Sequence, residues 1–395
     1  MTPGPPSAAQ RRGVEFLSRG QPLAARQAFD EALTAGQDDV LTRLGLAYAS
    51  QALGDAAAAR EAVDAALALD AGNLRALLLK GELVLADGDE RAAAAFFQAA
   101  LNSAPAAAGL PPDLQHSLQQ AQATVVRLAG HFEATVRRHL AALPAALAAA
   151  GGGASARFEQ SLDLLLGKKA LYLQQPRLYC FPQLPHIQFF DRAQFPWLDA
   201  VEAATAEIRE ELLAVLQQPD SFSPYVERDP TRPQIVQDGL LGNPDWSAFY
   251  LWKNGSRIEA NAARCPRTLQ ALAGVPMPQI PGRSPSILFS QLRPGARIPP
   301  HHGFVNTRLI CHLPLIVPAG CGFRVGNETR EWREGQAWVF DDTIEHEAWN
   351  RSEHTRVLLL FEIWRPELNA EERARVSALF EAIGQHQGSA GEWGI

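Results

Sequence analysis

The stretch Arg293–Leu315, RPGARIPPHHGFVNTRLICHLPL, decides the fold of the C-terminal half of the chain. It begins with the turn signal Pro294-Gly295 and ends in an apolar run that has the length and composition of a β-strand. Similar short runs, separated by turn signals, occupy most of the chain after Trp246. Many short strands at close spacing predict a double-sheet jelly roll. The predicted strands are Phe249–Trp252, Ile287–Leu292, Thr307–Val317, Gly322–Val325, Ala337–Phe340 and Arg356–Ile363.

Helices are predicted on both sides of these strands. The segment Leu198–Leu216 has apolar residues at helical spacing. Near the C-terminus, Asn369 is followed three residues later by Glu372, which is the signature of a capping box. We therefore expect a C-terminal helix to begin at this point.

The first hundred residues repeat with a period of 34 residues, which is the length of the tetratricopeptide repeat that this segment resembles. In each copy a glycine is expected to end the first helix of a pair at positive φ. Each pair leaves an apolar face that only a neighbouring pair can cover, so the pairs are expected to stack. The alternative is an unrelated Ala-rich helical bundle, but five sets of similar residues recur at the same 34-residue interval. These sets are Gly20, Gly54 and Gly88; Ala25, Ala59 and Ala93; Phe29, Val63 and Phe97; Ala32, Ala66 and Ala100; and Leu33, Leu67 and Leu101.

A transitional segment separates the two halves. It is rich in Ala and Gln and ends in Gly151-Gly152-Gly153, which is either a hinge or a loop within a domain. The sequence therefore predicts an α+β multidomain protein. Three tetratricopeptide-like units are expected over residues 1–105, a helical linker over residues 106–155, and a double-stranded β-helix (jelly-roll) domain over residues 156–395.

Composition narrows the class of protein. A chain of 395 residues with 47% hydrophobic residues is long enough for two domains with separate cores. The formal net charge of -7, with no dense basic stripe, argues against a nucleic-acid partner. The four cysteines form no CxxC pair. No secretory signal and no membrane span are evident, so we expect a cytoplasmic protein.

The strongest chemical signal is a cluster of histidines, because five of the ten histidines fall between residues 301 and 354. His301 and His346 lie in loops that a jelly roll can bring to one mouth, and two imidazoles suit Fe(II). Arg356 opens an apolar strand ten residues after His346, where a guanidinium can grip a dicarboxylate. Asp341 and Asp342 are candidates for substitute metal ligands or for turn and supporting roles, of which we favour the latter.

A glycine stands where many non-haem iron enzymes have a carboxylate ligand, two residues after the first histidine. Here that residue is Gly303, which we expect to leave a gap beside the metal. The stretch Arg293–Leu315 resembles the PGxxxxPHxGxxNxRLxxHL pattern of the aspartyl/asparaginyl β-hydroxylase family. The segment Cys321–Trp349 is similar to the family block containing NET, W-x-E-G and FDDxxEHExW. The closing FEIWRPEL is similar to the family's VWHPEL-like ending, and the resemblance covers about residues 172 to 380.

The resemblance implies an Fe(II)- and 2-oxoglutarate-dependent oxygenase that uses O2. It implies that His301 and His346 bind iron and that Arg356 pairs with the distal carboxylate of 2-oxoglutarate. Ser290 is expected to donate a hydrogen bond to the same carboxylate, and His312 to lie near the metal-binding end of the cosubstrate. The structural alternatives are that His312 is a core histidine with its hydrogen bonds satisfied within the protein and that Ser290 has only a packing role.

The chain also departs from the family pattern. Ile310 stands where family members have a second arginine, and Arg308 is the nearest cation that could take over cosubstrate binding. Leu241 and Leu288 stand where the family has cationic residues for a substrate carboxylate. These departures bear on which substrate is recognised rather than on the core chemistry.

The resemblance implies hydroxylation of an unactivated carbon, by preference the β-carbon of an Asp- or Asn-type residue in a protein or peptide. A small molecule or a lipid is the enzymatic alternative. The repeats are expected to recruit the protein or peptide substrate. Rivals from other classes are a peptide-binding adaptor with an inactive jelly roll and a cupin-like isomerase that uses another metal.

Overall fold

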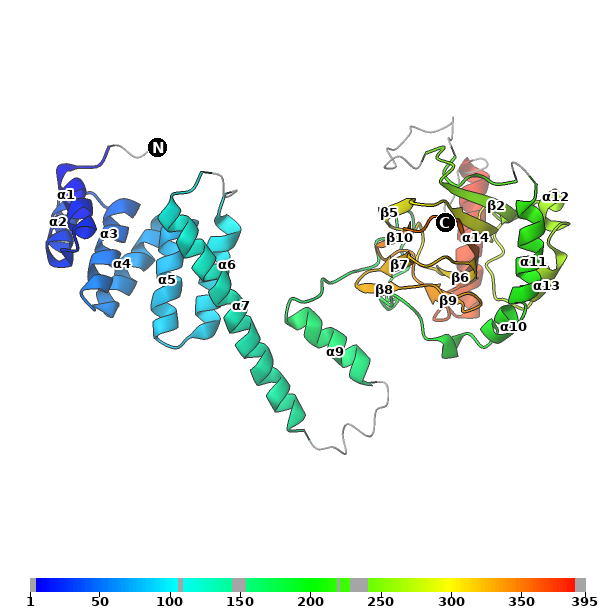
Figure 1. Cartoon of the computed structure of the whole chain (residues 1–395), viewed down its shortest axis with the longest axis horizontal. Helices are drawn as coiled ribbons and strands as arrows, with labels where there is room; N and C mark the ends of the chain where they lie inside the picture. Colours follow the sequence, from blue (N-terminus) through cyan, green and yellow to red (C-terminus); the bar gives the residue numbers. More distant parts are fainter. Residues whose placement is uncertain (1–4, 106–108, 144–153, 219–220, 228–240, 388–395) are drawn as a thin grey trace. The chain divides into compact units, whose positions relative to one another are not determined.

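The computed structural model describes residues 5–105, 109–143, 154–218, 221–227 and 241–387. The chain divides into two compact units, Met1–Leu166 and Gly167–Ile395, which we call the helical unit and the β-domain (Figure 1). The division lies eleven residues after the predicted boundary at 155/156. The predicted hinge Gly151–Gly153 lies outside the described residues. None of the described helices has the length and hydropathy needed to cross a membrane.

The helical unit begins with three helix pairs, as the 34-residue period predicted. A glycine follows the first helix of each pair at positive φ, with values of 69°, 76° and 87° at Gly20, Gly54 and Gly88. The repeated alanines are fully buried between the helices. The helices are α1 (Ala8–Ser18), α2 (Pro22–Thr34), α3 (Val40–Ala52), α4 (Ala56–Leu69), α5 (Leu74–Ala86) and α6 (Glu90–Ser103).

The segment predicted as a linker is largely part of the helical unit. Its long helix α7 (Pro112–Ala141) buries Leu114 and Leu118 in the same hydrophobic cluster as Leu77 and Phe97 of the third pair. This helix therefore covers the apolar face that the last repeat would otherwise expose. The helix α9 (Ala154–Leu165) completes the unit.

The β-domain contains two antiparallel sheets. The large sheet has the order β1-β2-β4-β11-β6-β9, with β3 paired to β2, and the small sheet has the order β5-β10-β7-β8. The strands β4-β11-β6-β9 and β5-β10-β7-β8 form the eight-stranded double sheet expected of a jelly roll. The strands are β1 (Ser223–Pro224), β2 (Trp246–Lys253), β3 (Ser256–Arg257), β4 (Ile287–Leu292), β5 (Arg297–His301), β6 (Arg308–Ile316), β7 (Cys321–Val325), β8 (Glu328–Arg330), β9 (Trp338–Phe340), β10 (His346–Asn350) and β11 (Arg356–Trp364).

All six predicted strands are present, but three strands of the small sheet were not predicted. The strand β5 contains Pro299-Pro300, and β10 reads HEAWN, so neither shows an apolar alternation. The predicted helix Leu198–Leu216 is divided at Ala204, and Asn369 and Glu372 form the predicted capping box. The helices of the β-domain are η1 (Arg192–Gln194), α10 (Leu198–Ala203), α11 (Thr205–Leu216), α12 (Glu259–Ala262), α13 (Pro266–Ala271) and α14 (Ala370–Gln387).

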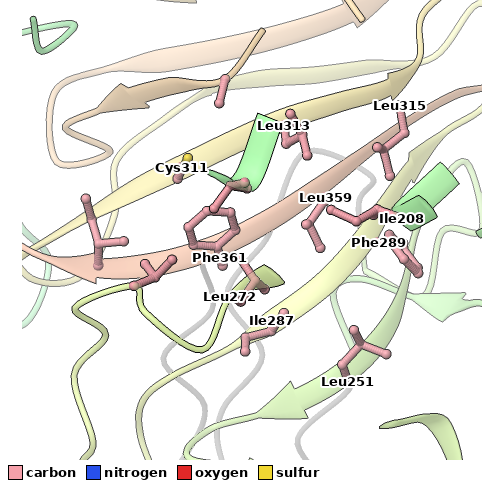
Figure 2. Close-up of a cluster of buried hydrophobic side chains, with 14 of the residues drawn as sticks. Ile208, Leu251, Leu272, Ile287, Phe289, Cys311, Leu313, Leu315, Leu359 and Phe361 are labelled. Atoms are coloured by element: carbon pink, nitrogen blue, oxygen red, sulfur yellow. The ribbon is translucent and has the colours of Figure 1, made fainter. Parts of the chain in front are cut away.

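The alternation of side chains on the large sheet separates packing from chemistry. Odd-numbered residues of β4, β6 and β11 pack in one cluster with α11, as Figure 2 shows for Phe289, Leu313 and Ile208. Even-numbered residues of the same strands share a second cluster with strands of the small sheet, as Leu288 and Leu358 do. This second face encloses the candidate site.

Candidate active site

The two predicted iron ligands lie side by side on neighbouring strands of the small sheet. His301 ends β5, His346 begins β10, and the two residues are register partners. Their ring centroids are 4.0 Å apart. The Nδ1 of His301 donates to the carbonyl of Pro299 (2.8 Å), and the Nδ1 of His346 donates to the carbonyl of Ile344 (3.1 Å). Both bonds fix the tautomer, so Nε2 of each ring is the nitrogen offered to a metal.

Both imidazoles are in the protonation state that binds metal. Burial lowers the pKa of His301 to about 4. Burial and the neighbouring His301 hold the pKa of His346 well below its ordinary value. Neutral rings with a fixed tautomer fit a divalent metal ion. Within the described residues, no group of three or more His, Cys, Asp or Glu side chains is arranged to hold a metal. The histidine pair is the candidate centre because its two neutral rings lie close together in one cavity.

The gap predicted beside Gly303 is wrong, because the carboxyl group of Asp342 fills that space. A Cβ at residue 303 would lie 2.7 Å from Oδ1 of Asp342 and closer still to its Cγ and Oδ2. Oδ1 is buried and has no hydrogen-bond partner among the residues that the structure describes. Burial raises the pKa of Asp342 to about 6, and Arg308 opposes that shift. The carboxyl group of Asp342 thus lies against Gly303 and lines the same cavity as the histidine pair.

Arg308 has a different place from the one expected of a cosubstrate-binding residue. Its Nη1 donates to Oδ2 of Asp342 (2.9 Å), and its Nε lies 3.0 Å from Oε1 of Glu362. All three side chains are about 1% exposed. Ile310, two residues further on, lines the cavity, whereas Arg308 does not. We therefore assign Arg308 to holding Asp342 rather than to replacing the missing second arginine.

Asp341 has a turn and packing role, as favoured from the sequence. Its carboxylate accepts hydrogen bonds from Arg365 and from Gln174, each at 2.6 Å, and from the backbone of Thr343 at 3.0 Å. With its oxygens bonded in this way, Asp341 has little capacity left to bind a metal.

Arg356 is a buried cation without a counter-charge among the described residues. Its side chain is 1% exposed, and its Nε has no protein hydrogen-bond partner. Burial lowers the pKa of Arg356 to about 10, so the guanidinium stays charged at neutral pH. Leaving a buried charge uncompensated is costly. The position therefore fits an anionic group of a bound molecule.

Ser290 and His312 line the same cavity as Arg356 and the histidine pair. The hydroxyl of Ser290 accepts a hydrogen bond from Nε1 of Trp246 (3.3 Å), which directs its own proton elsewhere. Nδ1 of His312 has no hydrogen-bond partner in the described part of the chain. Burial, followed by the charge of Arg356, holds the pKa of His312 well below its ordinary value. The structure thus brings together every predicted site residue except Arg308. The cavity also contains Asp342 and the aromatic rings of Tyr225, Trp246, Phe323, Trp332 and Phe340.

Sequence reasoning missed Trp246 and Trp332 as cavity residues and did not connect Asp342 with Gly303. Trp332 is the first residue of the W-x-E-G motif, so a signal for it was present. A second pocket of the β-domain, lined by Arg192, Glu202 and Trp338 among others, contains no histidine or cysteine. It offers no set of ligands comparable with the histidine pair.

Comparison with known proteins agrees with the resemblance seen in the sequence. Residues 202–366 match the family described as Aspartyl/Asparaginyl beta-hydroxylase. The chain is 37% identical over 144 residues to the human "Aspartyl/asparaginyl beta-hydroxylase", covering 36% of this chain and 19% of that protein. It is 35% identical over 191 residues to the "Ornithine lipid ester-linked acyl 2-hydroxylase" of Rhizobium tropici, covering 47% of this chain and 63% of that protein. The chain thus spans less than two thirds of the length of either relative.

The helical unit is similar to solved helical-repeat structures at low identity. The Yersinia enterocolitica chaperone SycD is 16% identical with a TM-score of 0.29, covering 32% of this chain and 83% of that chain. The first TPR domain of the human RPAP3 protein is 16% identical with a TM-score of 0.26, covering 31% of this chain and 93% of that chain. The predicted resemblance to the β-hydroxylase family is confirmed, and the repeat architecture rests on the helix pairs themselves.

Proposed function

We propose that the β-domain, which matches the aspartyl/asparaginyl β-hydroxylase family, is an Fe(II)- and 2-oxoglutarate-dependent hydroxylase. The observation that carries the proposal is one cavity lined by two neutral imidazoles of fixed tautomer and an unpaired guanidinium. Bound Fe(II) and 2-oxoglutarate would supply, with O2, the oxidising power that replaces C–H with C–OH as 2-oxoglutarate becomes succinate and carbon dioxide.

Each residue has a role that its surroundings support. His301 and His346 would hold the metal through Nε2. Arg356, buried and without a counter-ion among the described residues, would bind the distal carboxylate of 2-oxoglutarate. Ser290 would donate its hydroxyl proton to the same carboxylate, since its bond with Trp246 uses only a lone pair of the oxygen. His312 would act as a further polar contact of the cosubstrate.

Asp342 would act beside the metal rather than as one of its ligands. Arg308 binds its Oδ2, while Oδ1 remains without a protein partner in the cavity that the histidines line. A fixed carboxylate oxygen of this kind can accept a hydrogen bond from a molecule bound next to the histidine pair. The aromatic walls would keep bulk water out of the same space.

The test uses the full chain with Fe(II), 2-oxoglutarate and O2. We expect slow formation of succinate without any prime substrate, followed by proton NMR. Calorimetry under anaerobic conditions should show that 2-oxoglutarate binds only when metal is present. Absence of both binding and succinate formation would overturn the proposal and favour the peptide-binding adaptor.

The target proposed first is the β-carbon of an Asp- or Asn-type residue in a protein or peptide, which is the target that the family name describes. The helical unit would recruit this protein, because stacked helix pairs build an extended binding surface. Mass spectrometry of lysate peptides before and after treatment with the active enzyme would identify it as a gain of one oxygen atom.

One observation favours an acyl chain as a second candidate target. Arg356 is the one Lys or Arg that lines the cavity in the described part of the chain, and Ile310 adds an apolar wall. An acidic side chain would find, among the described residues, no cation lining the cavity other than Arg356, which the proposed function assigns to 2-oxoglutarate. A relative named as a lipid acyl 2-hydroxylase is consistent with this alternative. Incubating the enzyme with lipid extracts instead of peptides distinguishes the two targets.

A further inference from the structure

Trp332 is a buried residue of the cavity whose indole N–H has no protein acceptor. The residue is 5% exposed, and Nε1 has no hydrogen-bond partner among the described residues. It lies between β8 and β9 and lines the same cavity as the histidine pair and Arg356. A buried donor left without an acceptor is destabilising, and buried Trp N–H groups usually find one. An acceptor supplied by a ligand would remove this cost.

Neighbouring rings fix the orientation of the indole. Trp332 stacks on Phe323 with centroids 5.4 Å apart, and on Trp338 with centroids 5.9 Å apart. The interplanar angles are 25° and 15°. Packing of this kind leaves the ring little freedom to turn its N–H toward another acceptor. The direction of the donor is therefore set before any ligand arrives.

The charge beside Trp332 indicates what kind of acceptor fits. The guanidinium carbon of Arg356 lies 4.9 Å from the centroid of the indole ring. Nε of Arg356 and Nδ1 of His312 are also without protein partners. The three residues that carry these unmatched nitrogens, Trp332, Arg356 and His312, line one cavity. A carboxylate has enough lone pairs to accept from more than one of these groups.

We propose that the indole N–H of Trp332 donates a hydrogen bond to the carboxylate of 2-oxoglutarate that Arg356 binds, which makes Trp332 a cosubstrate-binding residue. This inference rests on the proposed function, because it assumes that 2-oxoglutarate is the ligand of Arg356. It gives the tryptophan of the W-x-E-G motif a chemical role. A phenylalanine at this position would keep the aromatic stack and lose the donor.

The test measures the affinity of 2-oxoglutarate for the full chain loaded with Zn(II), which binds the cosubstrate without turnover. Calorimetry should show that Trp332→Phe weakens 2-oxoglutarate binding about tenfold, as expected for one lost hydrogen bond to a charged acceptor. Zn(II) affinity and the melting temperature should change little. Trp338→Phe is the matched control, because Trp338 belongs to the same stack but lines the other pocket. It should leave 2-oxoglutarate affinity unchanged.

A second measurement observes the indole N–H of Trp332 directly. In protein labelled with 15N-tryptophan and loaded with Zn(II), an indole N–H resonance should move downfield when 2-oxoglutarate is added. The Trp332→Phe variant should lack that resonance. If no indole resonance moves although calorimetry shows binding, or if Trp332→Phe binds as tightly as the wild type, the inference is wrong. If the wild type binds no 2-oxoglutarate at all, the proposed function itself fails.

Discussion

Replacing Gly303 with alanine tests the central feature of the site, which is the carboxyl group lodged against this glycine. The new methyl group would lie 2.7 Å from Oδ1 of Asp342 and closer to two further atoms of the same carboxyl group. The backbone cannot retreat easily, because Gly303 donates to the carbonyl of Asp342 (2.7 Å) and accepts from the amide of Arg177 (3.1 Å). The carboxyl group must therefore move.

The cost of that movement follows from what holds Asp342. Overpacking a buried position costs about 1–3 kcal/mol. Breaking a buried ion pair costs about 3–5 kcal/mol, but Arg308 keeps Glu362 as its second partner, so we take the lower end. The free energy of unfolding of the β-domain should fall by about 3 kcal/mol. For a domain of this size, that corresponds to a melting temperature lower by about 6–12 °C.

Differential scanning calorimetry of the full chain measures this shift in the transition of the β-domain. Gly274→Ala is the matched control, because a Cβ at Gly274 has no atom within 4 Å and its φ is not positive. That variant should melt as the wild type does or slightly higher. The double variant Gly303→Ala/Asp342→Ala removes the steric conflict and should recover part of the lost stability.

A Gly303→Ala protein that melts within a degree of the wild type would refute the argument. It would mean that the carboxyl group of Asp342 is free to leave, and that Arg308 does not fix it. If Gly303→Ala lowers the stability of the Asp342→Ala variant as much as it lowers that of the wild type, the cost has another origin than the contact with Asp342.

Three further predictions concern the ligands, the pH dependence and the division into two units. His301→Ala and His346→Ala should each abolish metal binding, measured by calorimetry, and succinate formation, measured by proton NMR. Arg356→Ala should weaken 2-oxoglutarate binding about ten- to a hundredfold and leave metal affinity nearly intact. Unchanged affinities would contradict these assignments. In metal-free protein the pKa of His312 is lowered on folding, so its contribution to stability is present above the unfolded pKa near 6.5 and is lost as pH falls. His312→Phe should therefore reduce the slope of the free energy of urea unfolding against pH, between pH 7 and 5, by up to about 1.4 kcal/mol per pH unit. The same slope in the variant and the wild type would exclude a contribution from His312. A fragment beginning at Gly167 should fold alone and still form succinate, with a higher apparent KM for a protein target. If circular dichroism shows that the fragment is folded but it forms no succinate, the helical unit contributes to the site.

The sequence was sufficient for features that depend on residue type and local period. The 34-residue period predicted the helix pairs because each repeat buries equivalent residues, and Ala25, Ala59 and Ala93 are fully buried in the three copies. The histidines and Arg356 could be chosen from residue type, spacing and resemblance. These features can be recognised in the sequence because they depend on residue type and on spacing along the chain.

The sequence was weaker where a strand lacks its usual pattern. The strands β5 and β10 carry the two histidines, yet prolines and charged residues hide their alternation. Both are defined by pairing with each other and, for β10, with β7. Pairing of this kind joins segments that are about forty-five residues apart, so it has no signature in either segment alone.

Only the tertiary structure decided how the polar residues of the site are paired. Gly303 and Asp342 lie thirty-nine residues apart in the sequence. In the folded protein the carboxyl group of Asp342 occupies the space beside Gly303 that was expected to be empty. The same is true of Arg308, whose partners Asp342 and Glu362 come from a later loop and from β11. Contacts between distant segments decide which buried charges are neutralised inside the protein and which, like that of Arg356, have no counter-charge among the described residues. A sequence gives the charges and their local spacing, whereas the energy of a buried charge depends on what folding places within a few ångströms of it.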